Sequence, residues 1–415
     1  MERFIAVLVG CVVALVLAPA AASAQPDFVP GEVVVKFKDD ATAQQRAAAS
    51  RAAGILERVA PVRGVGARLV EVTGNVRAAV RALERSPAVE YAEPNYIYRA
   101  LATPNDPRFN ELWGLHNTGQ GGGTADADID APEGWDLLGL GSFPSAGGAK
   151  VGIVDTGIRR SHPEFAGRVV DCGGVNNFGI SLLILILFSD PTIVDGKCED
   201  DNGHGTHVAG TIAANANNGT GVAGVAFNSP LAICKGLNGQ GSGTLVMIAN
   251  CITWLADRDA DVISMSLGGS AGSQALQDAV RNASEAGSLL VAAAGNSGNS
   301  SLSYPAAYPE VVSVAATDRN DNRASFSQFN ADVEVAAPGV DILSTWNDGG
   351  YRVASGTSMA TPHAAAVAAL IAGANPSGGP DEWRAALQAA TDDLGAPGRD
   401  PQFGFGRVTL SKVSP

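Results

Sequence analysis

Short apolar runs alternate with helical patterns from residue 149 onwards. The runs that predict strands are residues 151–154, 262–265 and 289–293. Residues 245–255 and 275–286 lie between them and are apolar at helical spacing. Strands that are buried on both faces have such continuous runs, because neither face meets water. The alternation therefore predicts an α/β fold, with a mainly parallel twisted sheet and helices on both of its faces.

The start of the chain has the pattern of a signal peptide. Residues 1–24 combine a charged start, an apolar stretch and the small residues 22–24 of a cleavage site. The apolar stretch is too short to span a membrane. A bacterial lipoprotein box ending at Cys11 is a minor alternative, because it would leave only residues 4–9 as the apolar core. We therefore expect a secreted, extracellular protein.

Residues 25–100 precede the α/β pattern and have a different one. Strands and helices are expected in the order strand, helix, strand, strand, helix, strand, over residues 31–38, 41–53, 56–59, 67–72, 76–85 and 89–91. This order is typical of a ferredoxin-like α+β domain. Pro104 and Pro107 then mark a linker. The sequence thus predicts a small domain at 25–100 and a main domain at 101–415.

The charge of the chain is unevenly distributed. Residues 25–100 carry 11 Lys and Arg against 9 Asp and Glu, a net +2, whereas residues 101–415 carry 16 against 32, a net −16. Nucleic-acid phosphates are bound by Lys and Arg, so the acidic main domain argues against a nucleic-acid partner.

Once the signal is removed, four cysteines remain in the chain, namely Cys172, Cys198, Cys234 and Cys251. An even number in an exported protein predicts two disulfides, which can be connected in three ways. We favour pairing of sequence neighbours, 172 with 198 and 234 with 251. Four buried thiols are the alternative, and no Cys-x-x-Cys spacing suggests zinc.

Polar residues follow two of the predicted strands, where an α/β sheet collects its ligands. Asp155 follows a buried run, and an unpaired carboxylate there would be costly. Its Asp-Thr-Gly sequence resembles the loop of aspartic proteases, but that chemistry needs a second carboxylate, and no second Asp-Thr-Gly exists. Asn296 follows another strand, and its amide can donate to a developing oxyanion. Each residue alone also fits a structural cap or turn.

Two further candidates open helices of small residues. His204 lies between glycines, where it can act as a mobile base, whereas His207 one turn later is expected to pack structurally. The chain has no His-Glu-x-x-His motif, which disfavours zinc. Ser358 precedes the apolar run of residues 364–374, which predicts a buried helix. Ser358 would then lie at the start of this helix, where free backbone N–H groups point at the reacting centre. An N-capping role is the alternative for Ser358.

The candidates follow the chain order Asp155, His204, Asn296, Ser358, which is the subtilisin order of acid, base and nucleophile. On these motifs the chain resembles the subtilisin family of serine proteases over nearly everything after the signal. Residues 103–107, Thr-Pro-Asn-Asp-Pro, resemble the amino-terminal segment of its thermitase-like branch.

The resemblance implies a role for each of the four residues. Ser358 would attack the scissile carbonyl to form an acyl-enzyme, His204 would transfer the proton, and Asp155 would orient the imidazole. Asn296 and the backbone N–H of Ser358 would form the oxyanion hole.

The resemblance also implies an endopeptidase of broad specificity that acts on polypeptides and is a monomer. Its substrate-binding residues would be Ser266, Leu267, Gly268, Ala293, Ala294 and Gly295. The first three match a strand to which an extended peptide adds, backbone to backbone. The other three would wall the first specificity pocket, with Ser303 near its base. No acidic residue is evident there, so an uncharged P1 side chain is expected.

The resemblance further implies that residues 25–100 are a propeptide, which acts as an intramolecular chaperone and inhibitor. Self-cleavage is expected between about residues 98 and 104. A structural calcium ion is implied at a loop that begins near residue 215, and no organic cofactor is expected. The implied ligands of the ion are Asp106, Glu164, Asn215, Asn218, Thr220 and Val222, three of them through backbone carbonyls.

Residues 181–188 depart from the family pattern, because Ser181 is followed by seven consecutive apolar residues. A covered strand is the favoured interpretation, and an exposed patch that touches a partner or lipid is the alternative.

Two other function classes remain open at this point. A catalytically idle, peptide-binding relative is disfavoured by the four intact site residues. A selective processing protease often carries a further carboxyl-terminal domain, whereas this chain ends soon after Arg407.

Overall fold

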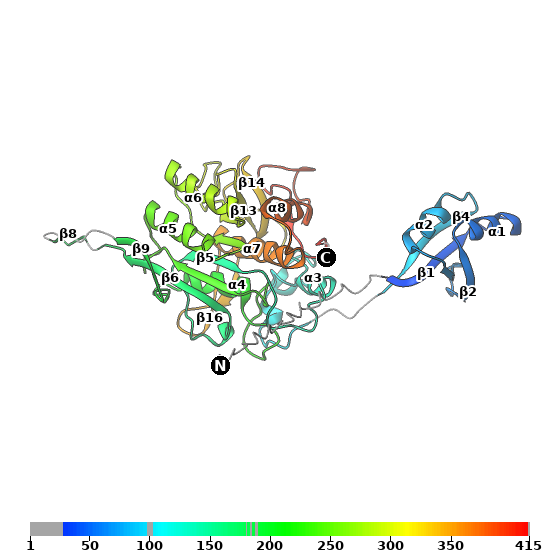
Figure 1. The fold of residues 1–415 in the computed structure, drawn as a ribbon, viewed down its shortest axis with the longest axis horizontal. Helices are drawn as coiled ribbons and strands as arrows, with labels where there is room; N and C mark the ends of the chain where they lie inside the picture. The colour runs from blue at the N-terminus through cyan, green and yellow to red at the C-terminus, as the bar shows by residue number, and fades with distance from the viewer. Residues whose placement is uncertain (1–27, 98–102, 180, 183–184, 187–189, 414–415) are drawn as a thin grey trace, which may run out of the picture. The chain divides into compact units, whose positions relative to one another are not determined.

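The computed structural model describes residues 28–97, 103–179, 181–182, 185–186 and 190–413, and it divides into two compact units. These are the N-terminal unit, Met1–Tyr98, and the C-terminal unit, Arg99–Pro415 (Figure 1). The predicted signal peptide and most of the predicted self-cleavage segment lie outside the described residues. No helix in the described part of the chain is both long and apolar enough to span a membrane.

The N-terminal unit has one four-stranded antiparallel sheet in the order β2-β3-β1-β4, which is the ferredoxin-like order. Its elements are β1 (Phe28–Phe37), α1 (Ala43–Ala52), β2 (Ile55–Pro61), β3 (Arg68–Val72), α2 (Val76–Glu84) and β4 (Val89–Tyr96). Val33, Val35 and Leu83 are fully buried between the sheet and the helices. The α+β prediction for this region is therefore confirmed.

The C-terminal unit is built on a ten-stranded sheet in the order β17-β18-β14-β13-β12-β11-β5-β10-β6-β9. Its strands are β5 (Val151–Asp155), β6 (Val169–Asn177), β9 (Asp190–Asp195), β10 (Leu231–Lys235), β11 (Val262–Met265), β12 (Leu289–Ala293), β13 (Val311–Thr317), β14 (Val333–Pro338), β17 (Thr391–Asp392) and β18 (Arg407–Val408). All pairs between β6 and β18 are parallel, and only the end strands β9 and β17 are antiparallel to their neighbours. The predicted mainly parallel sheet is confirmed.

Helices cover both faces of this sheet (Figure 1). The helices are α3 (Ala131–Leu137), α4 (His204–Ala213), α5 (Leu245–Ala256), α6 (Gln274–Glu285), α7 (Thr357–Ala374) and α8 (Pro380–Ala389). Residues along β5 alternate between two cores: Val151 and Ile153 join the core that contains α4 and α7, and Val154 joins the core that contains α5 and α6. A strand that contributes to two cores has no wet face, which explains its continuous apolar run.

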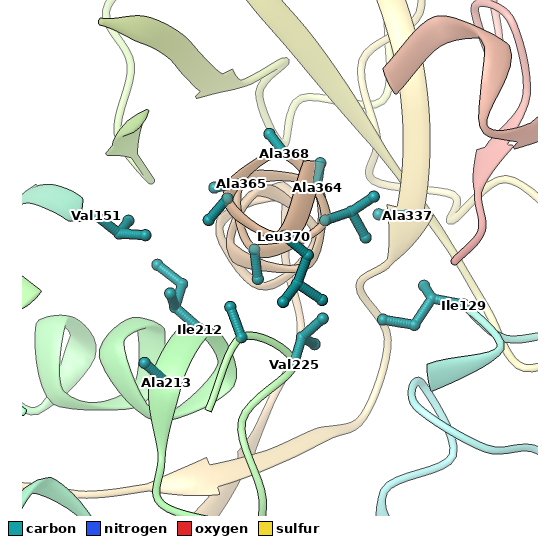
Figure 2. Close-up of a cluster of buried hydrophobic side chains, with 14 of the residues drawn as sticks. Ile129, Val151, Ile212, Ala213, Val225, Ala337, Ala364, Ala365, Ala368 and Leu370 are labelled. Carbon is teal, nitrogen blue, oxygen red and sulfur yellow. The ribbon is translucent and has the colours of Figure 1, made fainter. Parts of the chain in front are cut away.

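Helix α7 runs through the middle of the larger core (Figure 2). Residues 359–372 are all buried, including a long series of alanines. Figure 2 shows Ala364, Ala365 and Ala368 on the helix, with Val151 of the sheet and Ile212 of α4 around it. Small side chains allow the helix to approach the sheet and α4 closely, and this packing fixes the position of the helix start.

Both predicted disulfides are present with the predicted pairing. Cys172 is bonded to Cys198 and Cys234 to Cys251, with Cα–Cα distances of 5.4 and 5.5 Å. The first joins β6 to the segment before α4, and the second joins β10 to α5.

Among the described residues of the C-terminal unit, two short hairpins lie outside the ten-stranded sheet. In the apolar insertion, β7 (Ser181–Leu182) pairs antiparallel with β8 (Leu185–Ile186). The prediction that this insertion is a covered strand concerns side chains that lie outside the described part of the structure. The second hairpin pairs β15 (Ile342–Thr345) with β16 (Tyr351–Ala354) and packs on α4.

Candidate active site

The candidate site lies at the carboxyl ends of β5, β11 and β12. Asp155 is the last residue of β5, Ser266 follows β11 directly, and Asn296 lies three residues after β12. His204 is the first residue of α4 and Ser358 the second of α7. The order of strands reverses at β5, with β10 and β6 on one side and β11 and β12 on the other. Ligands of open α/β sheets bind at such a switch point.

Asp155 and His204 form a hydrogen-bonded pair. Nδ1 of His204 lies 2.8 Å from Oδ1 and 3.0 Å from Oδ2 of Asp155, whose side chain is fully buried. Because an ionised carboxylate only accepts, Nδ1 carries the proton and Nε2 of the neutral ring is the free base. The backbone N–H of Thr156 also donates to Asp155 Oδ1, at 2.6 Å, and holds the carboxylate in place.

Asp200 is a second carboxylate that supports this pair, and the sequence prediction missed it. Its Oδ1 accepts from Thr156 Oγ1 and from the backbone N–H groups of Asn202 and Gly203, each at 2.9 Å. Its Oδ2 accepts from the N–H and hydroxyl of Thr206, at 3.0 and 2.6 Å. Although burial raises the pKa of Asp200, these hydrogen bonds lower it below its ordinary value. Asp200 therefore stays ionised and ties the end of β5 to the start of α4.

The surroundings of His204 favour its charged form. Burial lowers the pKa of the imidazole, but the charges of Asp155 and Asp200 and the hydrogen bond to Asp155 raise it above its ordinary value. The two other histidines of these helices behave differently. Burial lowers the pKa of His207 and of His363 to about 4, so both are neutral and structural, as expected for His207.

Ser358 and His204 line the same cavity, of about 420 Å³. The Ser358 hydroxyl donates to the carbonyl oxygen of Ser266 at 3.1 Å, and the Ser266 hydroxyl donates back to the carbonyl oxygen of Ser358 at 2.8 Å. Among the described residues no hydrogen bond joins Ser358 to His204. Catalytic hydrogen bonds are often long or misaligned without substrate and tighten only when substrate binds.

Asn296 is oriented by the residue that precedes Ser358. Its Oδ1 accepts from the N–H and the hydroxyl of Thr357, at 2.8 and 2.9 Å. Its Nδ2 group has no protein partner among the described hydrogen bonds and borders a second cavity, of about 350 Å³, that Ser358 also lines. A fixed amide whose donors are free beside a serine is a suitable group for binding a developing oxyanion.

The predicted substrate strand separates the two cavities. Leu267 and Gly268 line both of them, and Ser266 lines the larger. Ala293 and Gly295 line the second cavity. Ala294 does not: it is buried in a small cluster with Ala315 and Phe403, because successive residues at a strand end face opposite sides.

The predicted calcium ligands converge beside α4. Asp106 accepts from the N–H groups of Asn217 and Asn218, at 2.6 and 3.2 Å. Glu164 accepts from Asn218 Nδ2 at 2.8 Å and from the N–H of Val222 at 2.9 Å. Thus two buried carboxylates face a single loop.

Within the described part of the chain, no Lys, Arg or His forms an ion pair with these carboxylates. Burial raises the pKa of both Asp106 and Glu164, against the hydrogen bonds that lower it, and the charge of Asp106 raises the pKa of Glu164 further. The carbonyl oxygens of Asn215, Thr220 and Val222 accept no hydrogen bond from described residues. Oxygen donors around uncompensated negative charge fit a hard cation such as Ca²⁺.

The side chain of Asn215 is engaged elsewhere, because its Oδ1 accepts from Arg168 at 2.5 Å, so only its carbonyl could serve as a ligand. A site built mainly of His, Cys, Asp and Glu is not found, since the described residues contain no group of three or more such side chains placed to hold a metal.

Comparison with known proteins identifies the chain. A family model described as "Subtilase family" matches residues 146–406, and one described as "Fervidolysin N-terminal prodomain" matches residues 15–95. The chain belongs to the subtilase family. It is a subtilisin-like serine endopeptidase with an N-terminal prodomain, and its relatives support the predicted thermitase-like branch.

Two curated relatives and one solved structure illustrate the similarity of this subtilase to known members. The thermophilic serine proteinase of Bacillus sp. strain AK1 is 37% identical over 384 residues, which are 92% of this chain and 86% of the relative. Thermitase of Thermoactinomyces vulgaris is 43% identical over 312 residues, which are 75% of this chain and 99% of thermitase. The structure named S41 psychrophilic protease matches with a TM-score of 0.57 at 36% identity, over 64% of this chain and 92% of that one.

Proposed function

We propose that this subtilase is secreted as a zymogen and hydrolyses peptide bonds through Asp155, His204 and Ser358. The observation that carries the proposal is the hydrogen bond between Asp155 and His204, because His204 lines the same cavity as Ser358. Nε2 of His204 takes the hydroxyl proton as Oγ bonds to the scissile carbonyl carbon. The imidazolium then gives this proton to the leaving amine, and an acyl-enzyme remains, which water hydrolyses by the same route.

Asn296 supports the charged intermediate of this reaction. Its Oδ1 is held by Thr357, so its Nδ2 can donate to the carbonyl oxygen as that oxygen becomes negative. The backbone N–H of Ser358, at the first turn of α7, is the second donor. The substrate backbone pairs with residues 266–268 and places its P1 side chain in the 350 Å³ cavity.

Calcium binds in this proposal at Asp106, Glu164 and Asn218, with the carbonyls of Asn215, Thr220 and Val222. The ion would supply positive charge to two buried carboxylates and so stabilise the loop beside α4. Ala294 is not retained as a P1 contact, because it lies in a core cluster.

The nucleophile can be tested by covalent labelling. A fluorophosphonate probe reacts with a serine hydroxyl only where a base and an oxyanion hole activate it. We expect the purified mature protein to be labelled on Ser358, and the Ser358→Ala and His204→Ala variants to lose the label. Ser355→Ala removes an exposed neighbouring hydroxyl and should retain it. A folded wild-type protein that carries no label, or carries it on another residue, would contradict the assignment.

A further inference from the structure

The cavity that would receive the P1 side chain has three walls, and two of these walls are joined by the buried side chain of Gln328. The walls are residues 267–270, residues 295–297 and residues 301–303. No Asp, Glu, Lys or Arg lines the cavity among the described residues. Its polar lining consists of Asn296, Thr357, several serines and Gln328. Gln328 comes from the loop between β13 and β14 and is only 5% exposed.

Gln328 is anchored to both of the walls that flank it. Its Nε2 donates to the carbonyl oxygen of Ser301 at 2.5 Å. Its Oε1 accepts from the N–H of Ser297 at a long 3.4 Å, and its backbone N–H donates to the carbonyl oxygen of Gly295 at 2.9 Å. The carboxamide therefore lies between the walls and keeps one N–H and part of its acceptor capacity for another group.

Gly295 shows how closely this carboxamide approaches the wall. A Cβ atom built on Gly295 would lie 1.9 Å from Oε1 of Gln328, and the φ angle of Gly295 is +110°, which favours glycine. The side chain of Gln328 therefore occupies the space that a larger residue at 295 would fill. Neither wall can move inward without displacing the amide.

We propose that Gln328 is a specificity-determining residue that makes the P1 cavity select uncharged side chains, an inference that rests on the proposed function. The carboxamide offers a neutral donor and acceptor where the P1 side chain ends. A charged P1 side chain would lose its water there and meet no opposite charge, which is costly. An uncharged side chain, apolar or with a hydrogen-bonding end, enters without that cost.

Exchanging the neutral amide for a carboxylate of the same shape tests the proposal. In Gln328→Glu, kcat/KM for matched peptides with Lys or Arg at P1 should rise roughly tenfold or more relative to peptides with Ala, and fall for peptides with Glu. Gln402→Glu is the matched control, because it makes the same charge change at an exposed position and should leave the P1 profile unaltered.

A second variant separates a contact with substrate from a purely structural role. Gln328→Met keeps the length of the side chain but removes its hydrogen bonds. We expect kcat/KM for peptides with Gln or Asn at P1 to fall several-fold, chiefly through KM, while peptides with Leu or Met keep theirs. This readout decides the matter if Gln328→Glu fails to fold, as judged by its thermal unfolding.

The outcomes for the inference and for the proposed function are distinct. If both variants bind the fluorophosphonate probe as the wild type does and keep its P1 profile, Gln328 lies behind the wall and the inference is wrong. If the wild type itself is not labelled on Ser358, the proposed function fails instead.

Discussion

At the scale of single residues, Asp200 supports the proposed catalytic pair, Asp155 and His204, without a hydrogen bond to either side chain. It binds Thr156, whose N–H holds Asp155, and it binds Thr206 in the first turn of α4, where His204 lies. Its negative charge also raises the pKa of His204. One side chain thus acts on both the position and the charge of the base.

This dual role predicts a change in the pH profile. His204 must be neutral to accept a proton, so activity rises with pH through its pKa. In Asp200→Asn that pKa should fall, because a nearby negative charge is lost. The acidic limb of the kcat/KM profile should then move to lower pH by a few tenths to about one unit, while the maximal kcat decreases.

Asp201→Asn is the matched control for this measurement. Asp201 is adjacent and also negative, but it is 62% exposed, and water screens its charge. Its removal should hardly move the acidic limb. Equal shifts in both variants would contradict a specific role for Asp200.

Sequence reasoning identified Asp155, His204 and Asn296 as candidates because each has a distinctive place beside a strand or helix. It missed Asp200 because an Asp before a helix also fits a simple cap, and nothing in the local pattern shows that Thr156 is its partner. Contacts between residues 44 positions apart depend on the fold.

At the scale of elements, the β15–β16 hairpin connects the proposed calcium loop to α4, the helix that begins at His204. Tyr351 of β16 donates through its hydroxyl to Glu164 at 2.9 Å. On the other strand of the hairpin, Thr345, which pairs with Tyr351, donates to the carbonyl oxygen of Thr206 at 2.7 Å, and the ring of Trp346 packs edge-on against His207. A change at Glu164 can therefore reach α4 through a single hairpin.

Removal of calcium should therefore lower thermal stability. In an inactive Ser358→Ala background, which prevents self-digestion, a chelator should lower the unfolding temperature by several degrees, because an ion bound only to the folded state stabilises it by mass action. In Glu164→Gln the chelator should have little further effect and calorimetric calcium binding should weaken. Glu285→Gln, at an exposed position on α6, should respond as the parent does. If the chelator leaves the unfolding temperature of the Ser358→Ala parent unchanged, the proposed calcium ion is ruled out.

The elements that sequence reasoning predicted best are those with continuous apolar runs. The runs at 262–265 and 289–293 coincide with β11 and β12. Strand β14 was not predicted, and it contains the buried Glu334, which would be unfavourable in isolation. Arg384 of α8 forms an ion pair with it, and Gln388 donates to it at 2.8 Å. Because the partners of Glu334 lie on a helix that is distant in sequence, the residues around Glu334 do not by themselves indicate a buried strand.

At the scale of the whole molecule, the two predicted domains carry net charges of opposite sign, +2 for residues 25–100 and −16 for residues 101–415. This favours association between a prodomain and the protease that follows it. The subtilase match and the prodomain match fall in different units, at residues 146–406 and 15–95.

Separation of the units should depend on the enzyme's own activity. We expect the wild type to appear as a cleaved product with a new N-terminus between about residues 98 and 104, and Ser358→Ala to remain at the length of the precursor. Mass spectrometry of both proteins, purified from a host that lacks other extracellular proteases, measures this. Adding active wild type should cleave the Ser358→Ala precursor. A Ser358→Ala protein that matures alone would show that another protease is responsible.

The two disulfides have a consequence for a protease whose chain can be cut by other molecules of the same protease. They close loops with sequence separations of 26 and 17 residues, from Cys172 to Cys198 and from Cys234 to Cys251. A nick within either loop leaves both fragments covalently tethered, so the damaged molecule stays in one piece until it meets a reductant. A single cleavage of this kind leaves one band on a non-reducing gel and gives two bands on a reducing gel.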